Sequence, residues 1–231
     1  LGNVVDPNDV IKQYGADLLR LWVASTDYTN DVRIGKETIG QLIEVYKKIR
    51  NTLRYMMGNL ADYNPKTDAI AYDELSPLDQ YTLNRLHSIV KQLTESFDNY
   101  EFYRYYQLLQ NFCVVDLSQL YFDIAKDVLY CDNQSAPRRR AIQTVLYELL
   151  ITLVPMLVPI MPHMAEDVWL NLPEHQRPDN ISSIILSDWP KVNATYENNN
   201  LSEQFTTMLQ VRDTARWPLK MLEKKVILVV P

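Results

Sequence analysis

The sequence predicts an all-α helical bundle that ends in a small mixed α/β tail, and three observations support this fold class. Only 5 of the 231 residues are glycine, which disfavours a fold built from many tight hairpins. Apolar residues recur at helical spacing over several long segments before Pro173. After Pro173 that spacing loosens, and short apolar runs alternate with polar stretches. We therefore expect long helices joined by short links, followed by a less regular end.

Helix start and stop signals follow one another along most of the chain. Asp6 can cap a helix whose first residue is Pro7, Gly15 interrupts that helix, and Ser76 repeats the capping pattern further on. The expected helices cover residues 7–14, 16–25, 36–62, 77–97, 101–130, 137–157 and 163–172, with a turn over residues 26–35 that holds a short extended piece at residues 31–33. In the tail we expect a strand at residues 184–186, a helix at residues 203–212 and a strand at residues 226–230.

Composition sets broad limits on the class of protein. The chain can bury a sizeable core, and its 47% apolar and 23% charged residues are ordinary for a soluble globular protein. The net charge of −6 argues against indiscriminate nucleic-acid binding but permits a local basic face, because recognition depends on where charge lies. No apolar run reaches transmembrane length and no signal peptide opens the chain, so we expect no membrane partner.

Cysteine usage and the first residues add two expectations. Cys113 and Cys131 lie in apolar helical stretches without a close cysteine or histidine, so both are expected to be buried free thiols. This pattern is typical of a cytoplasmic protein. The sequence has no initiating methionine and starts in mid-pattern at Leu1, so we expect a piece of something larger.

Nothing in the sequence forms a catalytic or metal site by spacing alone. His87, His163 and His175 are scattered, and no glycine-rich phosphate loop, metal-binding cluster or nucleophile elbow occurs. We therefore expect no catalytic residue and no metal ligand in this chain.

The strongest functional signal in the residues themselves is a basic stretch between Arg33 and Arg54. It holds six bases and two acids, which is a local net charge of +4. Lys47, Arg50 and Arg54 are three and four residues apart, so they fall on adjoining parts of one helical face that can follow RNA phosphates. A solvated face of an amphipathic helix is the alternative interpretation.

Two further stretches combine charge or aromatic rings with a predicted helix. In residues 102–106, Tyr103 and Arg104 fall off the core-facing spacing, which makes them surface candidates for stacking on RNA bases. The three arginines at residues 138–140 lie in the first turn of a predicted helix, where the helix dipole disfavours cations. Either an anionic partner or plain solvation would account for them.

Residues 1–7 (LGNVVDP) and 14–20 (YGADLLR) resemble the segment that follows the Lys-Met-Ser-Lys-Ser loop of class I aminoacyl-tRNA synthetases. The resemblance implies a stem-contact connector over residues 1–35, an anticodon-binding helical bundle over residues 36–173 and a C-terminal junction over residues 174–231. Later strings are similar to the isoleucyl members, and the first two of them differ from the usual valyl strings. These strings are residues 27–34 (DYTNDVRI), 48–55 (KIRNTLRY), 111–118 (NFCVVDLS) and 159–169 (PIMPHMAEDVW).

The isoleucyl resemblance implies a parent enzyme that uses ATP and Mg²⁺ to ligate isoleucine to its tRNA and that hydrolyses mischarged valine. Such editing is needed because one methylene supports only about 10–200-fold discrimination. The catalytic and editing domains, and a zinc module that bacterial relatives often carry further on, would lie outside these 231 residues. We therefore expect an inactive, cofactor-free, monomeric fragment whose partners are isoleucine tRNA and the missing domains of the same chain.

The resemblance and the charge pattern together nominate tRNA-binding residues. Arg50, Asn51 and Arg54 match the family string and are the first candidates, and Lys47 and Lys48 would add phosphate contacts. A second group, chosen for charge, aromaticity and expected exposure, consists of Arg33, Tyr103, Arg104 and Lys126. Three other interpretations stay open: the same region of a valyl-tRNA synthetase, a helical protein-interaction module without RNA, and an unrecognised stand-alone enzyme.

Overall fold

The computed structural model describes residues 6–30, 35–178, 181–191 and 193–227, and within them every side chain except those of Lys36, Asp213 and residues 215–227. These residues form helices and turns and no strand, so the predicted all-α class is confirmed. The α-helices are α1 (Pro7–Tyr14), α2 (Ala16–Ala24), α3 (Lys36–Asn59), α4 (Pro77–Asp98), α5 (Phe102–Asn111), α6 (Phe122–Cys131), α7 (Pro137–Leu157), α8 (Pro162–Asn171) and α9 (Asn199–Ile227). The other helical segments are η1 (Tyr72–Glu74), η2 (Phe112–Tyr121), η3 (Glu174–Gln176), η4 (Ile184–Leu186) and η5 (Ala194–Tyr196).

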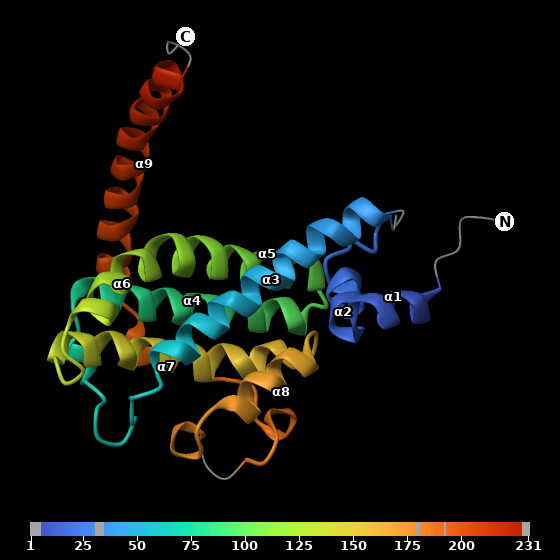
Figure 1. Ribbon diagram of the computed structural model, residues 1–231, viewed down its shortest axis with the longest axis horizontal. Helices are drawn as coiled ribbons and strands as arrows, with labels where there is room; N and C mark the ends of the chain where they lie inside the picture. Colours follow the sequence, from blue (N-terminus) through green and yellow to red (C-terminus); the bar gives the residue numbers. More distant parts are fainter. Residues whose placement is uncertain (1–5, 31–34, 179–180, 192, 228–231) are drawn as a thin grey trace.

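The long helices form one bundle, and α9 projects away from it (Figure 1). Local capping sets where several of these helices begin. The Asp6 side chain accepts a hydrogen bond from the Asn8 backbone N–H at 2.8 Å, and Ser76 does the same for Asp79 at the start of α4. Gly15, with φ of 88°, separates α1 from α2, as its place in the sequence predicts. The extended piece predicted at residues 31–33 lies outside the described residues.

Helix α7 is the core helix of the bundle. It is long and apolar enough to cross a membrane by length and composition, so the expectation that no apolar run reaches that length is wrong for this segment. However, 67% of its most apolar window is buried inside the molecule. Its buried residues include Val145, Leu149 and Leu153, which pack with buried residues of α3 and α4. Burial against other helices therefore accounts for its composition.

The helix predicted over residues 101–130 is confirmed, but its middle third is wound as a π-helix. Segments α5, η2 and α6 follow one another without a break in helical structure from Phe102 to Cys131. Within η2 the Ser118 hydroxyl donates to the Cys113 carbonyl at 2.9 Å, five residues back. Because π-helical turns are wide and uncommon, they frequently occur at functional sites. This one lies against α3.

The two cysteines differ in environment. Cys113 is buried as expected, but Cys131 is exposed, so the prediction for Cys131 was wrong. Cys131 is the last residue of α6, whose buried residues are Phe122, Ala125, Val128 and Leu129. The apolar stretch around it reflects the other face of the same helix.

The tail is helical where it is described, and the strand predicted at residues 184–186 was wrong. These residues form η4, because the Ser183 hydroxyl caps the Ile185 N–H and the Glu166 carboxylate accepts from the Ile184 N–H at 3.0 Å. Among the residues that the structure describes, this apolar run has no neighbouring strand to pair with. The helix predicted at residues 203–212 is confirmed within α9. Since α9 runs to Ile227, the strand predicted at residues 226–230 is wrong at residues 226–227, and the rest lies outside the described residues.

Candidate nucleic-acid interface

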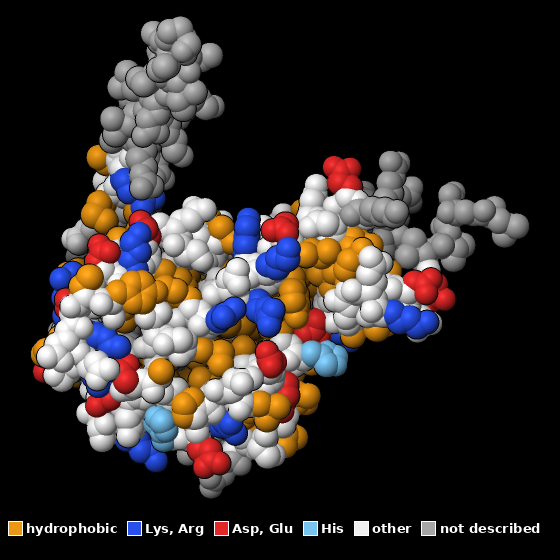
Figure 2. Space-filling model, viewed as in Figure 1, with side chains coloured by type: hydrophobic (Ala, Val, Ile, Leu, Met, Phe, Trp, Pro, Cys, Tyr) orange, Lys and Arg blue, Asp and Glu red, His pale blue; other side chains and the backbone are white. Residues whose placement is uncertain are grey.

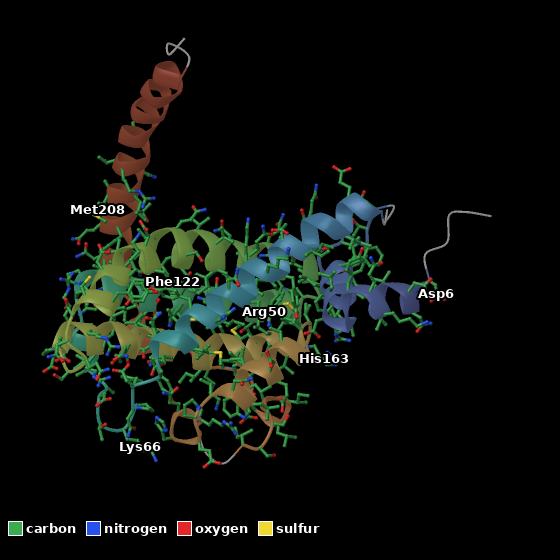
Figure 3. The ribbon with its side chains drawn as sticks, viewed as in Figure 1. Asp6, Arg50, Lys66, Phe122, His163 and Met208 are labelled. Atoms are coloured by element: carbon green, nitrogen blue, oxygen red, sulfur yellow. The ribbon has the colours of Figure 1, made fainter. Side chains whose placement is uncertain are left out.

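Helix α3 presents its basic side chains to solvent and its apolar side chains to the bundle. Ile49, Leu53 and Met56 are buried on one side. The exposed side carries the predicted candidates Lys47, Lys48, Arg50, Asn51 and Arg54. Figure 2 shows Lys and Arg side chains gathered over the middle of α3, and Figure 3 labels Arg50 among them. The helical spacing in the sequence therefore placed these five residues on one surface.

Most of the positive charges on this surface have no acidic partner. Lys47 forms an ion pair with Glu44 at 2.9 Å. Among the described residues, no carboxylate lies within ion-pair distance of Lys48, Arg50 or Arg54. Three solvated cations along one helix can therefore bind an anion without first breaking an internal pair.

A groove lies beside this surface, between α3 and the η2–α6 segment, and we call it the α3–α6 groove. It consists of two hollows of about 460 and 300 Å³ that share Asn51, Tyr55 and Tyr130. Thr52 and Ser118 line its base, with their hydroxyl oxygens 3.4 Å apart. The other lining residues are Arg54, Gly58 and Asn59 on α3 and Phe122, Asp123 and Lys126 on α6. The groove thus brings three predicted site residues together: Asn51, Arg54 and Lys126.

The groove also has aromatic walls that sequence reasoning did not assign to the site. Tyr55 stacks on Phe122 with ring centroids 4.3 Å apart and an interplanar angle of 21°. Tyr130 is 67% exposed. A signal for both tyrosines was present, because Tyr55 is four residues after Asn51 and Tyr130 is four residues after Lys126. Residues at that spacing share a helical face.

The remaining predicted candidates lie elsewhere. Arg104 on α5 is held by two carboxylates, Glu101 at 2.9 Å and Glu95 at 3.2 Å. It lines a separate hollow of about 510 Å³ along α5 and η2, which shares no residue with the α3–α6 groove. Tyr103 is 42% exposed on α5. Lys126 is in the groove but is paired with Asp123 at 2.6 Å. Arg33 lies outside the described residues.

Comparison with known families shows to which family this chain belongs. Residues 79–227 match the family described as "Anticodon-binding domain of tRNA ligase", which is more than half of the chain. The chain belongs to the anticodon-binding domain family of tRNA ligases. Residues 1–35 match a second family, "tRNA synthetases class I (I, L, M and V)". Both matches agree with the resemblance found in the sequence strings.

The anticodon-binding domain has close relatives among curated proteins named isoleucine–tRNA ligase. This chain is 48% identical over 212 residues to the protein of Caldanaerobacter subterraneus subsp. tengcongensis. It is 46% identical over 221 residues to the protein of Thermosynechococcus vestitus, and each aligned region covers 92% of this chain. The Crocosphaera subtropica protein is 43% identical over 250 residues that cover the whole chain. The chain spans about a quarter of the length of these relatives, 23% to 26%.

A solved structure shares the fold of the anticodon-binding domain. It is the ternary complex of Agrobacterium radiobacter K84 agnB2 LeuRS with tRNA and LeuAMS, with a TM-score of 0.61 and 16% sequence identity. The match covers 85% of this chain and 22% of that one. At this level of identity the likeness concerns the fold.

Two of the three arginines at residues 138–140, Arg139 and Arg140, have structural roles in this anticodon-binding domain. Arg139 is buried and donates to both carboxylate oxygens of Asp62, at 2.6 and 2.9 Å. Arg140 pairs with Asp68 at 3.4 Å and donates to the Asp62 carbonyl at 2.8 Å. Of the three, only Arg138 is an exposed side chain. A solvated basic turn is therefore the wrong interpretation for Arg139 and Arg140, because internal carboxylates neutralise them.

Proposed function

We propose that this chain is the tRNA-binding part of an isoleucine–tRNA ligase and that it binds isoleucine tRNA through α3 and the α3–α6 groove. The observation that carries the proposal is the row of cations Lys48, Arg50 and Arg54, which pair with no described carboxylate, beside a groove with aromatic walls. The name shared by the three relatives supports isoleucine rather than valine as the amino acid.

The residues divide into two roles in this proposal. Lys48, Arg50 and Arg54 contact phosphates, which positions the RNA without specifying sequence. Asn51 lines both hollows and carries an amide that can donate to and accept from a base edge. Lys47 and Lys126 add weaker phosphate contacts, because each must share its charge with a carboxylate. Tyr103 and Arg104 contact RNA outside the groove, and Arg33 keeps its proposed role as an RNA-binding residue.

The chemistry of amino-acid ligation belongs to the rest of the longer enzyme in this proposal. Among the described residues, no group of three or more His, Cys, Asp or Glu side chains is close enough together to hold a metal ion. As the family resemblance implies, we assign ATP and Mg²⁺ to the catalytic part of the longer enzyme. We propose that residues 1–35 connect to that part, residues 36–173 bind the anticodon arm, and residues 174–231 form the junction. The whole protein would be cytoplasmic and monomeric.

The test is a titration of the 231-residue chain with isoleucine tRNA at two salt concentrations, with valine tRNA and an anticodon-swapped transcript as competitors. Salt-sensitive binding that follows the isoleucine anticodon is the expected result. Salt-sensitive binding that ignores the anticodon would remove base recognition from the proposal. A folded chain that binds no tRNA would overturn it and favour a protein-interaction module instead.

A further inference from the structure

We propose that Tyr55 and Tyr130 form a clip for one unstacked base of the bound RNA, with Tyr130 as a cover that moves when the base enters. The proposal rests on the proposed function, since it needs RNA on the α3 surface. It adds two residues that were not among the predicted tRNA-binding residues, and it assigns each a separate task.

The first observation is a fixed aromatic floor. One face of the Tyr55 ring is taken by Phe122, which is itself buried. Tyr55 lines both hollows of the α3–α6 groove. A ring that is held on one side and lines a groove offers a rigid platform, and stacking on such a ring is available to any base because every base has a π-face.

The second observation is an unsatisfied hydroxyl at this platform. The Tyr55 hydroxyl oxygen is buried, and the neighbouring Tyr130 hydroxyl interacts with it without reaching hydrogen-bond geometry. Burial, with the neighbouring Tyr130 hydroxyl as a smaller cause, raises the pKa of Tyr55, so the group is a neutral donor. A buried donor without an acceptor is destabilising. An acceptor on a base edge would complete the hydrogen bond of this hydroxyl, so the hydroxyl would favour a bound base.

The third observation concerns Tyr130, whose side chain interacts with this hydroxyl. Tyr130 lines both hollows, lies one residue before the end of α6, and is 67% exposed. It forms no ring contact with another described aromatic side chain. An exposed side chain without such contacts changes rotamer easily. Tyr130 can therefore swing outward to admit a base and then close on its free face.

The surroundings favour RNA over a peptide as the occupant. Cations stand on both walls, with Arg54 on α3 and Lys126 on α6, where they can reach the phosphates on either side of an inserted base. The Asn51 amide at the shared wall forms no hydrogen bond with a described residue, so both its donor and its acceptor are available to a base edge. An aromatic platform with cations around it is the usual combination at single-stranded RNA sites.

The experiment uses anticodon stem-loop transcripts of isoleucine tRNA in which 2-aminopurine replaces one loop base at a time. With the unmodified chain, stacking in the clip should quench fluorescence at one loop position more than at the others. Tyr130→Ala should abolish that extra quenching and weaken binding by roughly 5- to 150-fold, the usual range for one stacked base.

Tyr55→Phe removes the hydroxyl and keeps the ring, so it tests the contribution of the hydroxyl alone. It should weaken binding by about 2- to 10-fold while the midpoint of thermal unfolding stays the same or rises, because no described group completes a hydrogen bond with this hydroxyl in the free protein. A purely structural role for Tyr55 predicts the opposite change in stability. The matched control is Tyr100→Asn, which removes an equally exposed tyrosine outside the groove, at a positive φ that asparagine tolerates.

The outcomes distinguish the two proposals. If the unmodified chain does not bind the transcripts, both the function and the clip are overturned. If it binds with salt dependence, and Tyr130→Ala changes affinity no more than Tyr100→Asn does, the clip alone is overturned. Loss of both quenching and affinity in Tyr130→Ala, with the control unaffected, supports the clip.

Discussion

The Asp62 carboxylate and the Arg139 guanidinium form a two-point hydrogen-bonded ion pair, at 2.6 Å and 2.9 Å, that joins the turn after α3 to the first turn of α7. The Arg139 side chain is only 11% exposed, so few water molecules can replace the carboxylate. This pair holds the helix that carries the candidate RNA surface against the core helix of the bundle.

Asp62→Asn should lower the free energy of unfolding by about 3 kcal/mol at pH 7, because it leaves a buried arginine without its counter-ion. Hydrogen bonds from Arg139 hold the pKa of the Asp62 carboxyl below its ordinary value. A lowered pKa in the folded state means that the stabilisation is fully present above the unfolded-state pKa, near 3.8, and is lost as pH falls through the lower folded-state value.

Urea titrations of both proteins between pH 7 and pH 2.5 measure this effect. The difference between the unmodified chain and Asp62→Asn should be constant down to about pH 5 and should shrink below pH 4. Glu44→Gln is the control, since it breaks an exposed pair on α3 and should change nothing measurable. A difference that grows with acidity would contradict the assigned direction.

Asp17→Ala should weaken the packing of α2 against α8 and so lower the stability of the fold. The buried Asp17 carboxylate accepts hydrogen bonds from the backbone N–H of Met164 at 2.7 Å and from that of His163 at 3.3 Å. Its removal leaves helix N–H groups unpaired, with an expected loss of about 3 kcal/mol in the free energy of unfolding. His163→Ala removes only an exposed ring contact to the same carboxylate and should cost much less. If both variants lose the same free energy of unfolding, the stabilisation comes from the contact between the Asp17 and His163 side chains and not from the backbone N–H groups of α8.

Arg50→Glu with Arg54→Glu should abolish tRNA binding at physiological salt without changing the far-ultraviolet circular dichroism. At low salt the slope of log affinity against log salt should fall by about 1.4 to 1.8, since two phosphate contacts are lost. Lys91→Glu with Arg138→Glu makes the same change in net charge at exposed positions on α4 and α7. If this control weakens binding equally, the effect is one of overall charge, and the site assignment is wrong.

Thiol titration should find one reactive cysteine in the folded chain and two in the unfolded chain. Burial raises the pKa of the Cys113 thiol to about 12, so almost none of it is thiolate at pH 8. Cys131 is exposed and should react with an aromatic disulfide reagent at once. Cys131→Ser should remove the fast reaction and leave the slow one, whose rate should follow unfolding in urea. Two fast thiols would mean that η2 opens in the native state.

Local chemistry explains which elements could be predicted from the sequence. The Asp6 and Ser76 caps, the break at Gly15 and the proline that starts α7 all act within a few residues, so their effects are visible in a short window. The basic face of α3 was predicted for the same reason, since helical spacing alone decides which side chains share a face.

Local sequence patterns were sufficient to predict the all-α fold, the order of the helices and the surface on which Arg50, Asn51 and Arg54 lie together. The tertiary structure decided the rest, because each remaining feature depends on residues far apart in the chain. Asp62 neutralises Arg139 across 77 residues, and the Glu166 carboxylate fixes the start of η4 by accepting from the Ile184 N–H, 18 residues away. Tyr130 reaches Tyr55 only because the chain turns back and packs η2 and α6 on α3, which creates a groove that no single helix contains.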